Sequence, residues 1–215
     1  MPKTKTSLLR KIMPGVFVLP QNGSKGYGIV HFVQRPNGNL ILDPGFISDA
    51  YDEIDALGGV KAMLISDRHF AGPATNAIAE HFGAKTYCSQ IEFDATKHRK
   101  NDVHVDKVLP FTRQTIESDI TLIPTPGHTD GQFSALVPLG TKRVLFTSDF
   151  VWREKGKWRP GNLSKKKSGK SFESLRELNF DAVIPWTSYS ADEFVVPIKS
   201  VDKTVDEMIA ACTKP

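Results

Sequence analysis

The stretch AMLISDRHFAGPATNAIAEHFG, residues 62–83, predicts a strand, a loop and a helix in direct succession. Its apolar start is typical of a strand that is buried on both faces. Pro73 in the first turn of the helix and Gly83 just past its end match the usual placement of these residues. The loop between them begins with the polar residues Asp-Arg-His, 67–69. It is therefore either part of a ligand or metal site at a strand end, or an ordinary turn that contains a histidine.

The rest of the chain shows the same mixture of strands and helices. Runs of β-branched and aromatic residues, bounded by Gly, Pro and Asn, predict strands. These strands cover residues 15–20, 27–34, 38–45, 61–66, 85–89, 120–127, 133–139, 143–149 and 180–186. Amphipathic or capped segments predict helices over residues 48–59, 73–82, 171–178 and 201–214. This order predicts a layered α/β (α+β) fold, with sheets covered by helices.

Composition narrows the class of protein. The chain has 215 residues, of which 40% are hydrophobic and 24% charged, so one globular domain over residues 1–215 is expected. Cys88 and Cys212 lie too far apart in sequence to suggest a disulfide framework or a cysteine-based zinc motif. No apolar run of about 18 residues is present, so no membrane partner is expected. Together these features favour a cytoplasmic protein.

The basic charge of the chain is concentrated in residues 153–170. This segment carries eight basic residues and one acidic residue, whereas the formal net charge of the whole chain is only +4. We interpret it as a solvated loop with two glycine-containing turns. A basic rim that attracts an anionic small-molecule substrate is the alternative. Nucleic acid is not an expected partner, because no nucleic-acid-binding motif accompanies the charge.

Polar side chains follow the ends of several predicted strands. Asp67 and His69 are two residues apart and would project to the same side of an extended segment. With His128 they make two imidazoles and one carboxylate, a set that suits Zn²⁺ or Fe²⁺ with one position open for water. Other strand ends are followed by Asp149 and by Thr187-Ser188. A metal ion at such a place would turn its bound water into a nucleophile.

Four segments in this order resemble the metallo-β-lactamase superfamily. They are LISDRHFAGPATNAIAEHFGAKTYCS, TPGHTDGQ, VLFTSDF and DAVIPW, and the early strand GNLILDPG adds to the resemblance. The similarity extends from about residue 12 to residue 190. It implies a four-layer αββα sandwich with a metal site at the shared edge of the two sheets. It also implies hydrolysis of thioesters, lactones, β-lactams, phosphodiesters or other bonds, usually with one or two metal ions.

The metal signature of that family is only partly preserved here. The family pattern Thr-His-x-His-x-Asp-His falls on Ser-Asp-Arg-His-Phe-Ala-Gly, residues 66–72. The resemblance therefore implies Asp67, His69 and His128 as ligands of a first ion. For a second ion it leaves only Asp149, because Ala71, Gly72 and Thr187 stand where other ligands would be. One divalent ion, Zn²⁺ or Fe²⁺, is expected and a second is not.

Two functions remain open on these residues. The first is a mononuclear metal-dependent hydrolase of a small ester, thioester or phosphoester, with Asp149 as fourth ligand or catalytic base. In this hydrolase the expected substrate-binding residues are Arg68, Thr187 and Ser188. Its substrate is expected to be anionic. The second is a catalytically inactive protein of the same fold that binds a small molecule or a partner. Asp67 would then pair with Arg68 or His69, and His128 with Asp149. The sequence predicts neither the substrate nor the oligomeric state.

Overall fold

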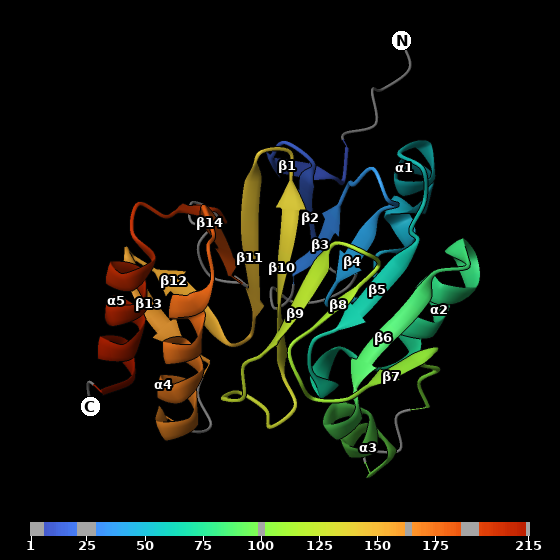
Figure 1. The fold of residues 1–215 in the computed structure, drawn as a ribbon. Coiled ribbons are helices and arrows are strands. Elements are labelled where there is room, and N and C mark those ends of the chain that lie inside the picture. The colour runs from blue at the N-terminus through green and yellow to red at the C-terminus, as the bar shows by residue number, and fades with distance from the viewer. Residues whose placement is uncertain (1–6, 21–28, 99–101, 162–164, 186–193, 214–215) are drawn as a thin grey trace.

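A computed structural model describes residues 7–20, 29–98, 102–161, 165–185 and 194–213 of the protein. Two large sheets stand side by side in the centre, and helices cover their outer faces (Figure 1). This arrangement is the predicted αββα sandwich, so the expected fold class is confirmed. Within the described ranges, no helix combines the length and the apolar character needed to span a membrane.

The first sheet has seven strands in sequence order. They are β1 (Arg10–Met13), β2 (Val16–Pro20), β3 (Ile29–Val33), β4 (Leu40–Leu42), β5 (Ala62–Ile65), β6 (Lys85–Ser89) and β7 (Lys107–Leu109). The strands from β1 to β4 pair antiparallel, whereas those from β4 to β7 pair parallel. Parallel neighbours end at the same edge of a sheet, so the loops that follow β4 and β5 meet there.

The second sheet has six strands in the order β15-β14-β11-β10-β9-β8. They are β8 (Gln114–Ile116), β9 (Ile120–Pro124), β10 (Phe133–Leu139), β11 (Lys142–Ser148), β14 (Ala182–Pro185) and β15 (Val196–Pro197). Strand β11 pairs antiparallel with β10 and parallel with β14. The expected strands at 120–127, 133–139, 143–149 and 180–186 thus correspond to β9, β10, β11 and β14.

Among the described residues, three of the four buried apolar clusters lie between the layers. The central core lies between the sheets and joins Leu64 of β5 to Phe133 of β10. On the outer face of the first sheet, Met63 packs under α1 (Tyr51–Ala56) and α2 (Pro73–Phe82). The adjacent residues Met63 and Leu64 thus serve opposite faces of the strand, which explains why all of β5 is apolar. The outer core of the second sheet lies under α4 (Lys165–Ser174) and α5 (Val201–Thr213).

Shorter elements complete the described part of the chain. They are α3 (Gln90–His98) and the 3₁₀ turns η1 (Ser48–Ala50), η2 (Arg68–Phe70) and η3 (Leu175–Glu177). The predicted ends of α2 are confirmed, with Pro73 as its first residue and Gly83 in the left-handed conformation, φ 65°, just past its end. Without a Cβ, glycine adopts this conformation at little cost.

The interpretation of residues 153–170 as a solvated loop is wrong. The segment begins within a hairpin of β12 (Val151–Glu154) and β13 (Lys157–Pro160), and it ends within α4. Lys155 and Gly156 both have positive φ, as a two-residue hairpin turn requires. Trp158 holds the hairpin in place because its side chain is buried in the outer core of the second sheet. Helix α4 begins at Lys165, before the expected start at 171, because lysine is a good helix former.

Candidate metal centre

Asp67 and His69 lie at the edge where β5 ends. Asp67 is the N-cap of the short turn η2, and its Oδ1 accepts a hydrogen bond of 2.7 Å from the backbone N–H of His69. The same oxygen lies 2.9 Å from Nδ1 of His69. The cap therefore folds the loop so that the carboxylate and the imidazole face one another.

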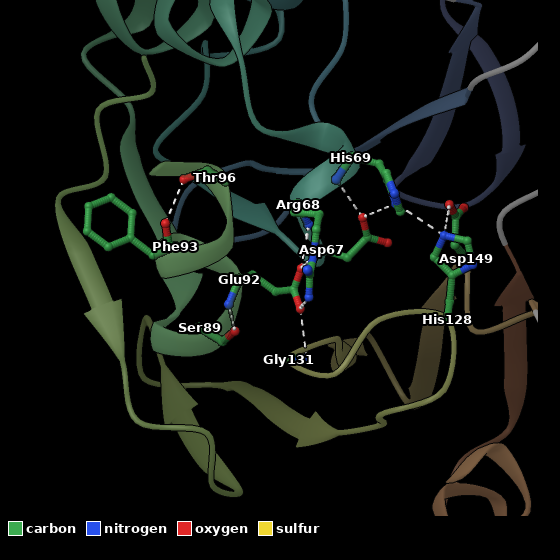
Figure 2. A network of polar contacts seen from close by, with 10 residues as sticks. All are labelled: Asp67, Arg68, His69, Ser89, Glu92, Phe93, Thr96, His128, Gly131 and Asp149. Atoms are coloured by element: carbon green, nitrogen blue, oxygen red, sulfur yellow. Dashed lines mark hydrogen bonds and ion pairs between the residues drawn. The ribbon is translucent and has the colours of Figure 1, made fainter. Parts of the chain in front are cut away.

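His128 and Asp149 come from loops of the second sheet. His128 follows β9, and its Nε2 lies 3.1 Å from Nδ1 of His69 and 3.5 Å from Oδ2 of Asp149. Asp149 follows β11 at a sharp bend, where Ser148 has a positive φ of 49°. All four side chains point toward one another across the junction of the sheets (Figure 2). Each offers one ligand atom, and these four atoms lie within 4.8 Å of one another.

Burial makes the protonation of this cluster unusual. Burial, together with the negative charges of Asp67 and Asp43, raises the pKa of Asp149 to about 9. Burial lowers the pKa of His128, although the nearby Asp67 acts against that shift. The shift of Asp149 therefore favours its protonated form, and that of His128 favours its neutral form. A cation placed among these side chains would favour the charged form of Asp149 beside Asp67.

Two carboxylate oxygens in the cluster show that a cation fits. Oδ2 of Asp67 and Oδ1 of Asp149 are both buried, and neither has a hydrogen-bond partner among the described residues. Buried polar atoms without a partner are costly and therefore rare in folded proteins. Imidazole nitrogens and carboxylate oxygens are also ligands that Zn²⁺ and Fe²⁺ accept. The chemistry of these donors therefore fits a divalent metal ion.

A buried glutamate holds the two ligand-bearing loops together (Figure 2). Glu92 of α3 receives hydrogen bonds of 2.7 and 2.9 Å from Nε and Nη2 of Arg68, and one of 2.8 Å from the backbone N–H of Arg68. It receives a further bond of 2.7 Å from the backbone N–H of Gly131. Arg68 lies between the ligands Asp67 and His69, and Gly131 follows the loop of His128. Glu92 therefore fixes one loop relative to the other.

Gly131 makes this approach possible. A Cβ at this position would lie 2.7 Å from Oε1 of Glu92 and equally close to Ile91 and Ser89. Burial alone would raise the pKa of Glu92, but the bonds from Arg68 and Gly131 outweigh it and lower that pKa below its usual value. The carboxylate is therefore charged and fully engaged.

A second polar chain supports the cluster from within the sandwich. Ser66 donates a hydrogen bond to the carboxylate of Asp43, and its Oγ lies 2.6 Å from Oγ of Ser148. These residues come from the ends of β4, β5 and β11. Burial raises the pKa of Asp43 to about 7, while the hydrogen bonds from Ser66 and Ser148 act against that rise. The chain ties Ser66 and Ser148, the neighbours of two candidate ligands, to each other.

Ala71 and Gly72, which stand where the family has ligands for a second ion, lie beside the cluster. Ala71 and Gly72 line a cavity of about 380 Å³, together with His69 and Asp149. Neither of these two residues offers a side-chain ligand, so this part of the cavity lies beside His69 and Asp149 without adding a donor. The cavity gives the cluster an open side through which a small molecule could approach.

The expected substrate-binding residues are placed less completely. The guanidinium of Arg68 is directed at Glu92 by two of its nitrogens, and its side chain is 22% exposed. Thr187 and Ser188 lie outside the described residues. Glu92 was not expected from the sequence, since nothing in its local pattern distinguishes it from other helix glutamates. Its role depends on contacts 24 and 39 residues away along the chain.

The contacts bear on both open functions. The pairing of Asp67 with His69, and of His128 with Asp149, is the arrangement expected of a protein without an ion. Arg68, however, pairs with Glu92, and the second oxygen of Asp67 has no partner in the part of the chain that the structure describes. A purely structural role for the cluster would leave this cost unexplained.

Comparison with known proteins identifies the fold. A metallo-beta-lactamase from Pontibacter korlensis matches 96% of this chain over 99% of its own, with a TM-score of 0.69 and 15% identity. One from Hirschia baltica matches 96% of this chain over 97% of its own, with a TM-score of 0.70 and 13% identity. The DIM-1 metallo-beta-lactamase matches 94% of this chain over 97% of its own, with a TM-score of 0.70 and 17% identity. No protein-family model and no curated protein sequence matches the chain.

These matches confirm the metallo-β-lactamase-like architecture that the motifs indicated. They cover nearly the whole chain, whereas the sequence identity is low throughout. At such identity the likeness establishes the fold, and activity has to be argued from the residues of the site.

Proposed function

We propose that the protein is a mononuclear metal-dependent hydrolase of a small ester, thioester or phosphoester. The observation that carries this proposal is the group of four ligand atoms within 4.8 Å, in which two buried carboxylate oxygens have no partner among the described residues. The fold supports the proposal because it places this group at the strand ends of both sheets, where ligands bind in layered proteins.

In this proposal Asp67, His69 and His128 hold the ion, and Asp149 is the fourth ligand or the catalytic base. A bound divalent ion supplies a Lewis acid and lowers the pKa of a water molecule to about 7. Asp149 suits the role of base because its Oδ1 has no partner among the described residues, and because the charge of a bound ion would favour its deprotonated form. The hydrogen bonds of Glu92 to Arg68 and Gly131 keep the loops of His69 and His128 at a constant separation.

Arg68, Thr187 and Ser188 remain the proposed substrate-binding residues. The bonds between Arg68 and Glu92 use Nε and Nη2, so Nη1 is the guanidinium nitrogen that would meet an anionic part of the substrate. The lysines at the start of α4 would add to this attraction, as a basic surface accelerates the encounter with an anion. Lys167 already pairs with Asp130, two residues after His128, at 2.6 Å.

Metal analysis tests the proposal directly. Protein purified without a histidine tag and reconstituted with Zn²⁺ or Fe²⁺ should retain about one ion per chain, and His128→Ala should lose it. The matched control is His104→Ala, since His104 is exposed and lies outside the cluster. Esters, thioesters and phosphodiesters are then tested for hydrolysis with each metal. Absence of a retained ion under metal-replete conditions would rule out the proposed hydrolase.

The pairing of Asp67 with His69 favours a second candidate function. A catalytically inactive protein of this fold would use the cleft only to bind a small molecule or a partner. Metal-dependent turnover that is abolished in Asp149→Asn excludes this candidate. Ligand binding without turnover, with every metal tested, supports it.

A further inference from the structure

The cavity of about 380 Å³ beside the candidate ligands is lined mostly by glycines and by residues with apolar side chains. Its lining comes from the loop after β4, from the loop between β5 and α2, and from Asp149. Only His69 and Asp149 among the described lining residues carry ionisable side chains. The others are Pro44, Gly45, Phe46, Phe70, Ala71, Gly72, Pro73 and Ala74.

Phe46 is the most exposed large apolar side chain of this lining. It is 54% exposed, whereas Phe70 in another part of the lining is only 9% exposed. A single exposed apolar residue on a protein surface needs no explanation. Phe46, however, lines the same cavity as Phe70 and the two candidate metal ligands His69 and Asp149. Its exposed ring is therefore available to cover an apolar group in the cavity.

The start of α2 also lines the cavity but offers little to an anion. Pro73 has no N–H, and the N–H groups of Thr75 and Asn76 are bonded to the carbonyl oxygen of Gly72 at 3.0 and 3.3 Å. Helix starts bind anions through free N–H groups, and most of those are used here. No lysine or arginine is among the described residues that line the cavity. An anionic group would thus find no cationic partner inside it.

We propose that this cavity is an acyl subsite, which takes the uncharged apolar portion of a carboxylic ester or thioester. The proposal rests on the proposed function for the identity of the bond that is cleaved, and it narrows the substrate to acyl compounds. With the acyl chain against Phe46 and Gly72, the carbonyl group would lie toward His69 and Asp149. Ala71 and Gly72, which replace expected ligands, gain a role as the floor of this subsite.

The size of the cavity favours a short acyl chain. Small-molecule pockets typically measure about 300–1,000 Å³, so this one is at the small end. Each buried CH₂ contributes about 0.8 kcal/mol to binding. Two further CH₂ groups, as in butyrate compared with acetate, should therefore improve kcat/KM about 15-fold.

Gly72 offers a way to fill the cavity without disturbing the fold. Its φ of 163° is extended backbone that any residue adopts, and a Cβ built there has no neighbour within 4 Å. Gly72→Leu should therefore fold normally and occupy the subsite. Gly169→Leu is the matched control, because a Cβ at Gly169 in α4 is equally unobstructed and Gly169 is not part of the lining.

Binding of hexanamide, an uncharged compound that keeps the acyl chain, tests the subsite without relying on turnover. We expect ligand-observed NMR to show binding to the wild type and to Gly169→Leu. Gly72→Leu should weaken it at least 10-fold, and Phe46→Ala about 5-fold through lost apolar contact. Equal affinity in the wild type and Gly72→Leu, with both shown to be folded by circular dichroism, would overturn the proposal. So would the absence of hexanamide binding to the wild type.

Turnover of p-nitrophenyl acetate and butyrate separates this proposal from the hydrolase. Binding of hexanamide that Gly72→Leu abolishes, with no ester cleaved, supports the subsite and removes the hydrolase. Cleavage of both esters at equal rates in the wild type removes the subsite and leaves the hydrolase. A preference for butyrate that Gly72→Leu abolishes and Gly169→Leu retains supports both.

Discussion

Two buried carboxylates in Figure 2 lie in adjacent clusters and have opposite surroundings. Each oxygen of Glu92 accepts two hydrogen bonds, from Arg68 and from Gly131 or the backbone of Arg68. In Asp67, Oδ1 is bonded to His69, whereas Oδ2 is buried without a partner among the described residues. The two side chains are equally buried, so burial alone does not distinguish a structural carboxylate from a ligand.

The difference lies in how far the protein itself satisfies each charge. A carboxylate with four hydrogen bonds and an arginine partner stabilises the arrangement around it only as long as that partner remains. A carboxylate with an unused buried oxygen is costly until something outside the chain binds it. Glu92 thus holds the loops in place, and Asp67 and Asp149 use the resulting geometry. The following predictions test this contrast.

The largest effect is expected for Arg68→Ala. This change removes the side chain that neutralises the buried Glu92, and breaking a buried ion pair from one side costs about 3–5 kcal/mol. The free energy of unfolding, measured by urea denaturation with a chelator present, should fall by about this amount. Because the pair also positions the loop of His69, metal affinity should fall as well.

Lys167→Ala is the control for Arg68→Ala. Lys167 and Asp130 also form an ion pair at 2.6 Å, but their side chains are 53% and 65% exposed. Exposed pairs contribute less than about 1 kcal/mol, so this variant should be nearly as stable as the wild type. Equal losses in the two variants would show that Glu92 has no special structural role.

Bound Zn²⁺ should raise the free energy of unfolding of the wild type by less than Arg68→Ala lowers it. Free Zn²⁺ at 100 times its dissociation constant should stabilise the folded protein by about 2.7 kcal/mol. Asp67→Asn should lose most of this gain because it removes a charged ligand. Asp55→Asn, which changes an exposed aspartate paired with His81, should keep it. The difference in unfolding free energy with Zn²⁺ and with chelator measures the effect, and equal gains in both variants would contradict the assignment of Asp67.

Asp149→Asn should have the smallest effect, and its sign should be opposite. The pKa of Asp149 is raised to about 9 in the folded protein from an ordinary value of 3.8. Between these values the folded protein keeps a proton that the unfolded chain releases. The free energy of unfolding therefore falls as the pH rises from about 4 to 9. Asparagine has no such proton. Without metal, the variant should be more stable than the wild type by about 1–3 kcal/mol at pH 7.

Urea denaturation at pH 5 and pH 8, with chelator present, checks this prediction. The advantage of Asp149→Asn should be larger at pH 8, whereas added Zn²⁺ should stabilise the wild type more than the variant. A variant that is less stable than the wild type at both pH values would show that Asp149 is satisfied within the chain.

Much of the fold could be predicted because local patterns carry it. The strand at 61–66 was recognisable from its uniformly apolar residues, and α2 from Pro73 and Gly83 at its two ends. The β12–β13 hairpin was missed because its charged residues resemble those of a loop. Its stability depends on Trp158, whose partners lie in α5 and in the second sheet. Such distant packing leaves no mark on the pattern of the hairpin itself.

The sequence by itself determined which donors follow the strands and which family ligands are replaced, at positions such as Ala71 and Gly72. Only the tertiary structure decided that His69 and His128, 59 residues apart, place their nitrogens 3.1 Å from each other. It also decided that Glu92 joins their loops and that one oxygen each of Asp67 and Asp149 stays without a partner among the described residues. The physical reason is that periodicity and capping act over a few neighbouring residues. The balance of a buried charge depends on every element packed around it.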